Sequence, residues 1–104
     1  MKYGLSPNHI VKITDIFKQF PEIEAALLYG SRAKGSYKQS SDIDISLKGK
    51  NLDLLSLSKI NNMLDDLMLP YKFDISIYHQ IYNADLLDHI KRVGNTLYQS
   101  SDIS

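Results

Sequence analysis

The sequence lacks cysteine and tryptophan and has no excess of either charge. Without cysteine, both disulfides and thiolate metal sites are excluded. Lys and Arg together number 12, as do Asp and Glu, so the basic excess typical of proteins that bind many nucleic-acid phosphates is missing. No apolar run approaches the roughly 20 residues that span a bilayer. These absences argue against an extended nucleic acid or a membrane as the partner.

The length and the first residues limit the organisation of the chain. A chain of 104 residues predicts one domain, residues 1–104, large enough to bury roughly 65 per cent of its unfolded surface. The segment from Met1 to Gly4 does not lead into the apolar region of a secretory signal. We therefore expect a soluble protein of the cytoplasm.

Hydrophobic spacing alternates between the helical and the strand period along the chain. Ser6 followed by Pro7 is typical of a helix start, as is Asn83, and either Asn51 or Asp53 caps a helix between them. The predicted strands span residues 25–29, 42–47 and 72–78, with a short last strand at 95–99. This alternation predicts an α/β domain with a small mixed sheet flanked by helices.

A glycine-serine pair ends the first predicted strand. Gly30 and Ser31 follow the apolar residues 25–29, where the chain must turn into a polar segment. Glycine lets the backbone approach a ligand closely, and the free N–H groups and the hydroxyl of a helical turn that begins at Ser31 suit a phosphate. Arg32 adds positive charge for a phosphate or partner contact. The turn therefore predicts a phosphate-binding element made of Gly30, Ser31 and Arg32.

Two aspartates alternate with aliphatic residues on the second predicted strand. Because Asp42 and Asp44 alternate with Ile43 and Ile45, a strand sends both carboxylates to one face. Carboxylates that share a small space disfavour each other's ionised form, and a divalent cation relieves this. Asp74 lies on the third predicted strand. The three aspartates are therefore candidate metal ligands, and magnesium with a phosphate opposite such acids is the chemistry of nucleotidyl transfer.

The spacing of these residues resembles that of a known superfamily. Gly30 and Ser31 are followed, after ten residues, by Asp42 and Asp44, and this resembles the Gly-Ser-x10-Asp-x-Asp element of polymerase beta-type nucleotidyltransferases. Asp74 matches the third acid of that superfamily. The resemblance implies the palm-like nucleotidyltransferase fold and identifies Asp42, Asp44 and Asp74 as catalytic residues.

Within that superfamily, the chain most resembles the minimal nucleotidyltransferase (MNT) antitoxins of HEPN/MNT toxin-antitoxin pairs. Their Gly-Ser-Arg-x-Arg-Gly opening is similar to residues 30–35 of this chain, and their small size is also similar. Lys34 stands where arginine is common in the family, which preserves the charge but loses the bidentate fork of a guanidinium.

The resemblance implies a magnesium-dependent transfer of AMP from ATP. The triphosphate would lie over Gly30 and Ser31, one or two magnesium ions would bridge it to Asp42 and Asp44, and Asp74 would position or deprotonate the attacking hydroxyl. That hydroxyl, on a tyrosine, would belong to a cognate HEPN toxin, a ribonuclease that becomes inactive once modified. The chain would then be the antitoxin and form a hetero-oligomer with its partner.

Other interpretations fit some of the same residues. An exposed Asp-x-Asp pair decorates the wet face of many strands, and Ser31 is also a good helix cap. The chain could neutralise a toxin by binding alone, or could modify a small molecule in the manner of aminoglycoside nucleotidyltransferases. His9, His79 and His89 share no ligand spacing, so none of them is expected to bind a metal.

Overall fold

The computed structural model describes residues 2–100. Within them, four strands form one sheet in the order β3-β2-β1-β4. β1 (Ala25–Tyr29) pairs antiparallel with β2 (Ile43–Lys48) and with β4 (Asn95–Gln99). β2 pairs in parallel with β3 (Phe73–Ile77). The sheet is therefore mixed and flanked by helices, and the predicted fold class is confirmed.

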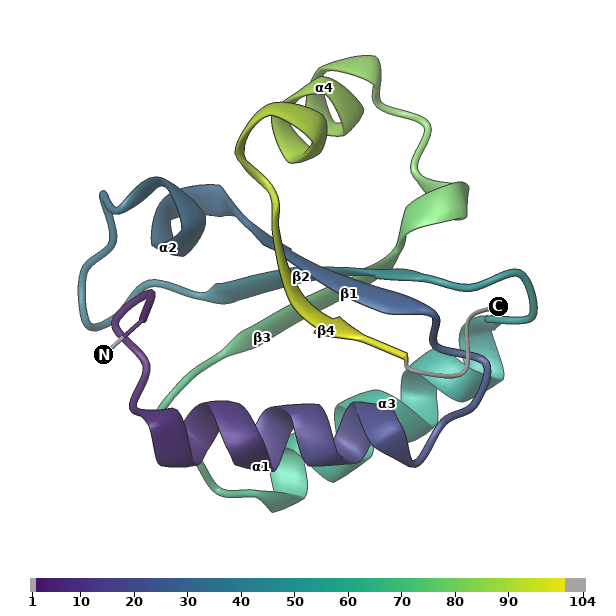
Figure 1. The fold of residues 1–104 in the computed structure, drawn as a ribbon, viewed down its shortest axis with the longest axis horizontal. Coiled ribbons are helices and arrows are strands. Elements are labelled where there is room, and N and C mark those ends of the chain that lie inside the picture. The colour runs from purple at the N-terminus through teal and green to yellow at the C-terminus, as the bar shows by residue number, and fades with distance from the viewer. Residues whose placement is uncertain (1, 101–104) are drawn as a thin grey trace.

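Two long helices cover one face of the sheet. Figure 1 shows α1 (Pro7–Lys18) and α3 (Leu54–Asp66) beneath the sheet and α4 (Ala84–Val93) above it. Burial of large aliphatic side chains stabilises a fold by about 1.5–3 kcal/mol each, and most of it occurs on the lower face. The buried residues there are Ala26, Leu28, Ile43, Ile45, Leu47, Ile75 and Ile77 from the sheet and Ile13, Ile16, Phe17, Ile60 and Leu64 from the helices.

The helix starts follow local capping chemistry. The Ser6 hydroxyl accepts a hydrogen bond from the N–H three positions later, at 3.2 Å, and Asp53 accepts one from the Ser56 N–H at 2.8 Å. Asn83 caps α4 in the same manner. Such caps satisfy N–H groups that have no partner within the helix. The predicted starts at Ser6 and Asn83 are confirmed, and α3 is capped by Asp53 and not by Asn51.

The bounds around the polar turn differ slightly from the predicted ones. β2 begins at Ile43, one residue after the predicted start at Asp42, and β3 ends at Ile77, where the 3-10 helix η1 (Tyr78–Gln80) begins. The turn after β1 contains a short helix, α2 (Gly30–Lys34). Asp42 therefore belongs to the loop that connects α2 to β2, just before the strand.

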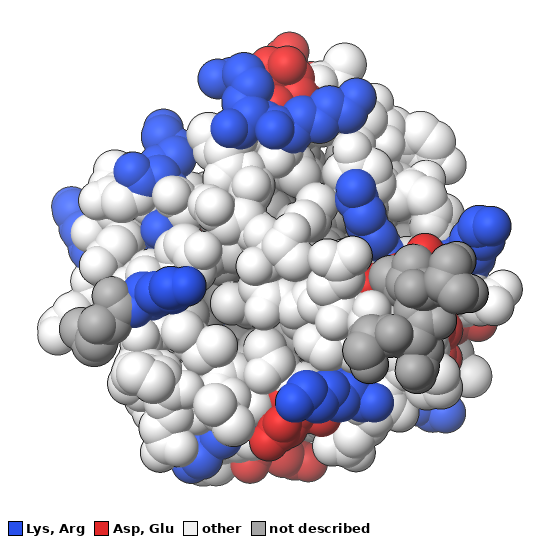
Figure 2. Space-filling view, viewed as in Figure 1, with Lys and Arg blue, Asp and Glu red and all other residues white. Residues whose placement is uncertain are grey.

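Charged side chains are scattered over the face seen in Figure 2. The lysines and arginines stand apart, mostly around the rim, and the centre is largely uncharged. The described residues thus form no continuous basic stripe on this face. Among residues 2–100, no helix has both the length and the apolar character needed to cross a membrane.

Candidate active site

Two aspartates lie side by side on the face of the sheet that α4 covers. The pairing of β2 with β3 sets Asp44 opposite Asp74. Ile43 and Ile45, on either side of Asp44, are 0% exposed and belong to the core on the other face, so strand alternation sends both carboxylates away from that core. Asp44 is half-buried and Asp74 is exposed. The structure therefore brings together two of the three acids selected from the sequence.

The third acid, Asp42, is exposed at the end of the loop before β2. Burial raises the pKa of Asp44 above its ordinary value, and the nearby charges of Asp74 and then Asp42 raise it further. A neighbouring negative charge disfavours the ionised form of a carboxyl group. The charge of Asp42 therefore acts on Asp44, but less strongly than burial or the charge of Asp74 does.

Gly30 lies directly against Asp44. Its φ of 76° falls in the left-handed region, which glycine adopts without strain. The end of β1 pairs with β2 so that Tyr29 lies opposite Asp44, and a side-chain carbon at position 30 would overlap the Asp44 carboxylate. Glycine is therefore favoured at this position by its backbone conformation, and the glycine-serine turn lies against Asp44.

The donors of this site are of the kind that could hold a hard divalent cation. Mg²⁺ is commonly bound by one or two carboxylates, with waters and substrate phosphates completing its shell. Asp44 and Asp74 offer two carboxylates, and the raised pKa of Asp44 reflects in part a repulsion that a cation relieves. Among residues 2–100, no three His, Asp or Glu side chains are close enough to enclose an ion by themselves.

Arg32 is buried, which argues against the direct phosphate contact expected from the sequence. Its side chain is 2% exposed, and two tyrosine rings flank the guanidinium. The guanidinium donates to the carbonyl oxygens of Ser41 at 3.0 and 3.2 Å, of Tyr3 at 2.9 Å and of Gln39 at 3.3 Å. A backbone carbonyl oxygen that is shielded from water needs a hydrogen-bond donor. Arg32 therefore holds the loop that leads into Asp42.

Sequence reasoning missed His89 as a part of this site. This half-buried residue of α4 accepts a hydrogen bond at Nε2 from the Gly30 N–H, at 3.2 Å. Its ring meets that of Tyr29 edge-on, with centroids 6.1 Å apart and planes at 80°. Burial raises the pKa of Tyr29, and the charges of Asp74 and Asp44 raise it further. Tyr29 lies opposite Asp44 in the register of β1 and β2. No spacing rule could have found His89, because it meets a partner 59 positions away.

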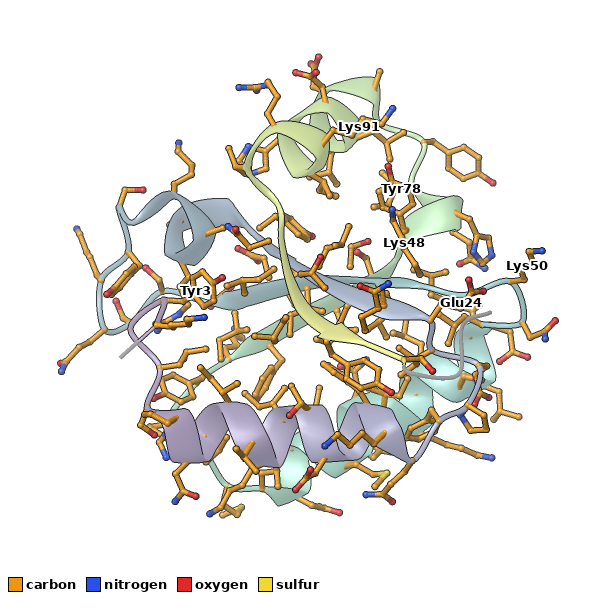
Figure 3. All side chains as sticks on the ribbon, in the orientation of Figure 1. Tyr3, Glu24, Lys48, Lys50, Tyr78 and Lys91 are labelled. Atoms are coloured by element: carbon orange, nitrogen blue, oxygen red, sulfur yellow. The ribbon has the colours of Figure 1, made fainter. Side chains whose placement is uncertain are left out.

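A basic cavity lies further along the same face of β2. Lys48 follows Asp44 by four positions, so strand alternation sets both on one face. The Lys48 ammonium lies 4.7 Å from the centre of the Tyr78 ring, and Figure 3 shows both side chains on the side of the sheet that α4 occupies. Along β2, the α4 face of the sheet therefore changes from an acidic residue, Asp44, to a basic residue, Lys48. The cavity, of about 380 Å³, is lined by Glu24, Lys48, Gly49, Lys50, Tyr78 and His79.

Comparison with known families accounts for the turn and the acid pair together. Residues 11–103 match the family model described as polymerase beta, nucleotidyltransferase. The chain belongs to this nucleotidyltransferase family. The matched region contains the Gly30 turn, both aspartate-bearing strands and α4. The family resemblance drawn from the turn and the acids is therefore confirmed.

One relative of this nucleotidyltransferase-family chain comes from Methanocaldococcus jannaschii and is named as a protein adenylyltransferase. The two sequences are 41% identical over an alignment of 69 positions, and this alignment covers 60% of this chain and 57% of the relative. The chain thus matches somewhat more than half of the relative's length.

Solved toxin-antitoxin structures share the fold of the nucleotidyltransferase-family chain. A crystal structure described as a toxin-antitoxin with AMP-PNP matches with a TM-score of 0.70 and 21% identity, over 93% of this chain and 76% of the other. A structure of a tri-AMPylated Shewanella oneidensis HEPN toxin in complex with its MNT antitoxin matches with a TM-score of 0.66 and 18% identity, over 89% and 71%. These likenesses concern the fold, which is confirmed as that of a nucleotidyltransferase.

Proposed function

We propose that this chain transfers AMP from ATP to a tyrosine hydroxyl of a cognate HEPN toxin, with magnesium as cofactor, and so acts as the antitoxin in the cytoplasm. The observation that carries the proposal is the pair of Asp44 and Asp74, in register on neighbouring strands and directly against the Gly30 turn. Family membership supports the reaction class. The named relative and the toxin-antitoxin neighbours support a protein as the acceptor.

Each part of the site has a role in this reaction. Gly30 leaves room for the triphosphate, and the Ser31 hydroxyl donates to a phosphate oxygen. Asp44 and Asp74, joined by Asp42 from the loop, would hold one or two magnesium ions, which neutralise charge on the phosphate oxygens when bound. Asp74 orients the acceptor hydroxyl and takes its proton. The hydroxyl oxygen bonds to the α-phosphorus as the bond to the bridging oxygen of the β-phosphate breaks, and pyrophosphate leaves.

The exposure of the acids favours an acceptor that comes from another protein. Asp42 and Asp74 are exposed, so a hydroxyl group of another molecule can reach them. A partner that brings its hydroxyl to this face would also exclude water from the reacting groups, which strengthens the electrostatic interactions within the site. A complex between the chain and its substrate protein is therefore part of the proposal.

The test combines the purified chain with ATP, magnesium and the product of the neighbouring gene, and measures the intact mass of that product. We expect the mass to rise by one or more AMP groups. Asp44→Asn should lower the rate by about a hundredfold or more, because the metal contributes several kcal/mol of transition-state stabilisation. Asp65→Asn is the matched control, since Asp65 is exposed on α3, and it should leave the rate unchanged.

Two outcomes would contradict the proposal. If Asp44→Asn transferred AMP at the wild-type rate, Asp44 would have no part in catalysis. Neutralisation of the partner by the wild-type chain without any gain of mass would favour an antitoxin that acts by binding alone. The second outcome is distinguished by toxin activity measured with and without ATP.

A further inference from the structure

Helix α4 makes a polar contact with the Gly30 turn. His89 accepts the Gly30 N–H at Nε2, at 3.2 Å, while the neighbouring Ile90 is 2% exposed. An imidazole that accepts at Nε2 is neutral, with its proton at Nδ1. The Gly30 N–H begins α2, and the first N–H groups of a helix have no partner within it. A side chain from a distant helix therefore satisfies the backbone donor at the start of the turn.

Gly30 contacts two other parts of the site. The Asp44 carboxylate occupies the space where a side chain at position 30 would lie. His89 accepts the Gly30 N–H and packs its ring edge-on against Tyr29, the residue before Gly30. A shift of the turn away from α4 would therefore break the hydrogen bond to His89.

A role in packing alone does not account for this arrangement. An apolar side chain would fill the same space beside Tyr29, but it could not accept the Gly30 N–H. The buried surface of α4 already includes Ile90, so the helix has an apolar anchor next to the histidine. The specific contribution of His89 is an acceptor nitrogen, Nε2, within hydrogen-bond distance of the Gly30 N–H.

We propose that His89 is a positioning residue for AMP transfer, which holds the Gly30 turn at its working distance from Asp44. The inference rests on the proposed function. Catalysis depends on the fixed geometry of reacting groups, and a displacement of about 1 Å can cost about a hundredfold in rate. His89 acts through Gly30, and it connects the docking of α4 to the geometry of the turn that receives the triphosphate.

Two substitutions separate the acceptor atom from the space that it fills. His89→Leu fills the site without an acceptor, and His89→Gln offers a carbonyl oxygen near the position of Nε2. Arg92→Gln is the control on the same helix, because it removes an exposed ion pair with Asp88, 2.8 Å apart, on the outer side of α4. Melting temperatures of all three variants report whether each one folds.

The first measurement is hydrogen exchange at the Gly30 amide, and the second is the rate of AMP transfer with its KM for ATP. We expect His89→Leu to speed exchange at Gly30 and to lower kcat by about tenfold, since loss of one hydrogen bond of about 1.5 kcal/mol corresponds to such a factor. The KM for ATP should change less than kcat. His89→Gln should restore both slow exchange and most of kcat, and Arg92→Gln should change neither.

Failure of this inference differs from failure of the proposed function. If the wild type transfers AMP and His89→Leu transfers it equally well, His89 does not position the turn. If His89→Gln is as impaired as His89→Leu, the acceptor atom has no role. If the wild type transfers no AMP, the proposed function fails and the positioning role falls with it. Hydrogen exchange at Gly30 then still decides whether the contact with His89 holds the turn.

Discussion

The two faces of the sheet are built from the same strands but differ in the polarity and the burial of their side chains. The face toward α1 and α3 is lined by aliphatic side chains, and Ile43, Ile45 and Leu47 are 0% exposed. The α4 face carries the alternate residues of β2, which are Asp44, Ser46 and Lys48. Because successive side chains of a strand point to opposite faces, one strand can stabilise the fold and carry the chemistry. Burial on the aliphatic face therefore stabilises a sheet whose other face carries charged and polar side chains.

Truncation on the two faces should have unequal effects on stability. Ile45→Ala removes a side chain that is 0% exposed and should lower the free energy of unfolding by about 2–5 kcal/mol. Leu27→Ala, on the α4 face of β1, should cost less because Leu27 is only half-buried. Urea unfolding measures both. Equal losses would mean that the α4 face is as tightly packed as the core.

Alanine substitutions at two glycines should distinguish the effect of backbone strain from that of contact with Asp44. Gly30 and Gly35 have φ of 76° and 82°, so alanine at either position should cost about 1–2 kcal/mol of stability. Only at position 30 would the added carbon meet Asp44, since no atom lies within 4 Å of it at Gly35. Gly30→Ala should therefore also lower AMP transfer by about a hundredfold, while Gly35→Ala should keep its rate. Similar rates for the two variants would dissociate the turn from the acids.

The pH dependence of stability should report the crowded acid. The pKa of Asp44 is raised in the folded state by burial and by Asp74 and Asp42, so the folded state binds its proton more tightly than the unfolded state. The contribution of Asp44 to stability is therefore fully present below its unfolded pKa, and is lost as pH rises through its folded pKa. Thermal unfolding without metal should show this loss in the wild type.

Asp44→Asn should remove that part of the pH dependence and raise the melting temperature above the folded pKa. Asp65→Asn serves again as the control, because Asp65 is an exposed residue of α3. An unchanged pH profile in Asp44→Asn would show that the repulsion among the acids is negligible.

The smallest effect is expected at two buried serines. Ser46 is 0% exposed on the α4 face, and its Oγ has no hydrogen-bond partner among the described residues. Ser46→Ala should therefore leave the free energy of unfolding unchanged or raise it by about 1 kcal/mol. Ser56 is also buried, but its hydroxyl donates to the Glu22 carboxylate at 3.3 Å, so Ser56→Ala should lower it by about 1 kcal/mol. A clear loss in Ser46→Ala would reveal an undetected partner.

Local signals predicted much of the fold and one half of the site. The caps at Ser6 and Asn83 and the alternation around Asp44 depend on neighbours a few positions away, and each was readable from the sequence. The alternation of the two strands predicts that Asp44 and Asp74 point away from the aliphatic core, whereas the parallel register that pairs them was not predicted from the sequence. Their roles in catalysis remain predictions.

The missed features depend on contacts between distant segments. Arginine is usually exposed, and nothing near Arg32 in the sequence indicates that Tyr3 and Ser41 will enclose it. His89 reaches Gly30 only because α4 folds over the end of β1. Spacing rules address single elements, whereas these residues join separate ones.

The parallel pairing of β2 with β3 has a consequence for the way in which activity arises. Parallel neighbours need a crossover connection, and here that connection is α3. Asp74 is therefore brought beside Asp44 by a connection that crosses the opposite face of the sheet. A chain in which β3 is not paired with β2 has no acid pair. A ligand that engages both acids would in turn favour the paired form of the two strands by mass action.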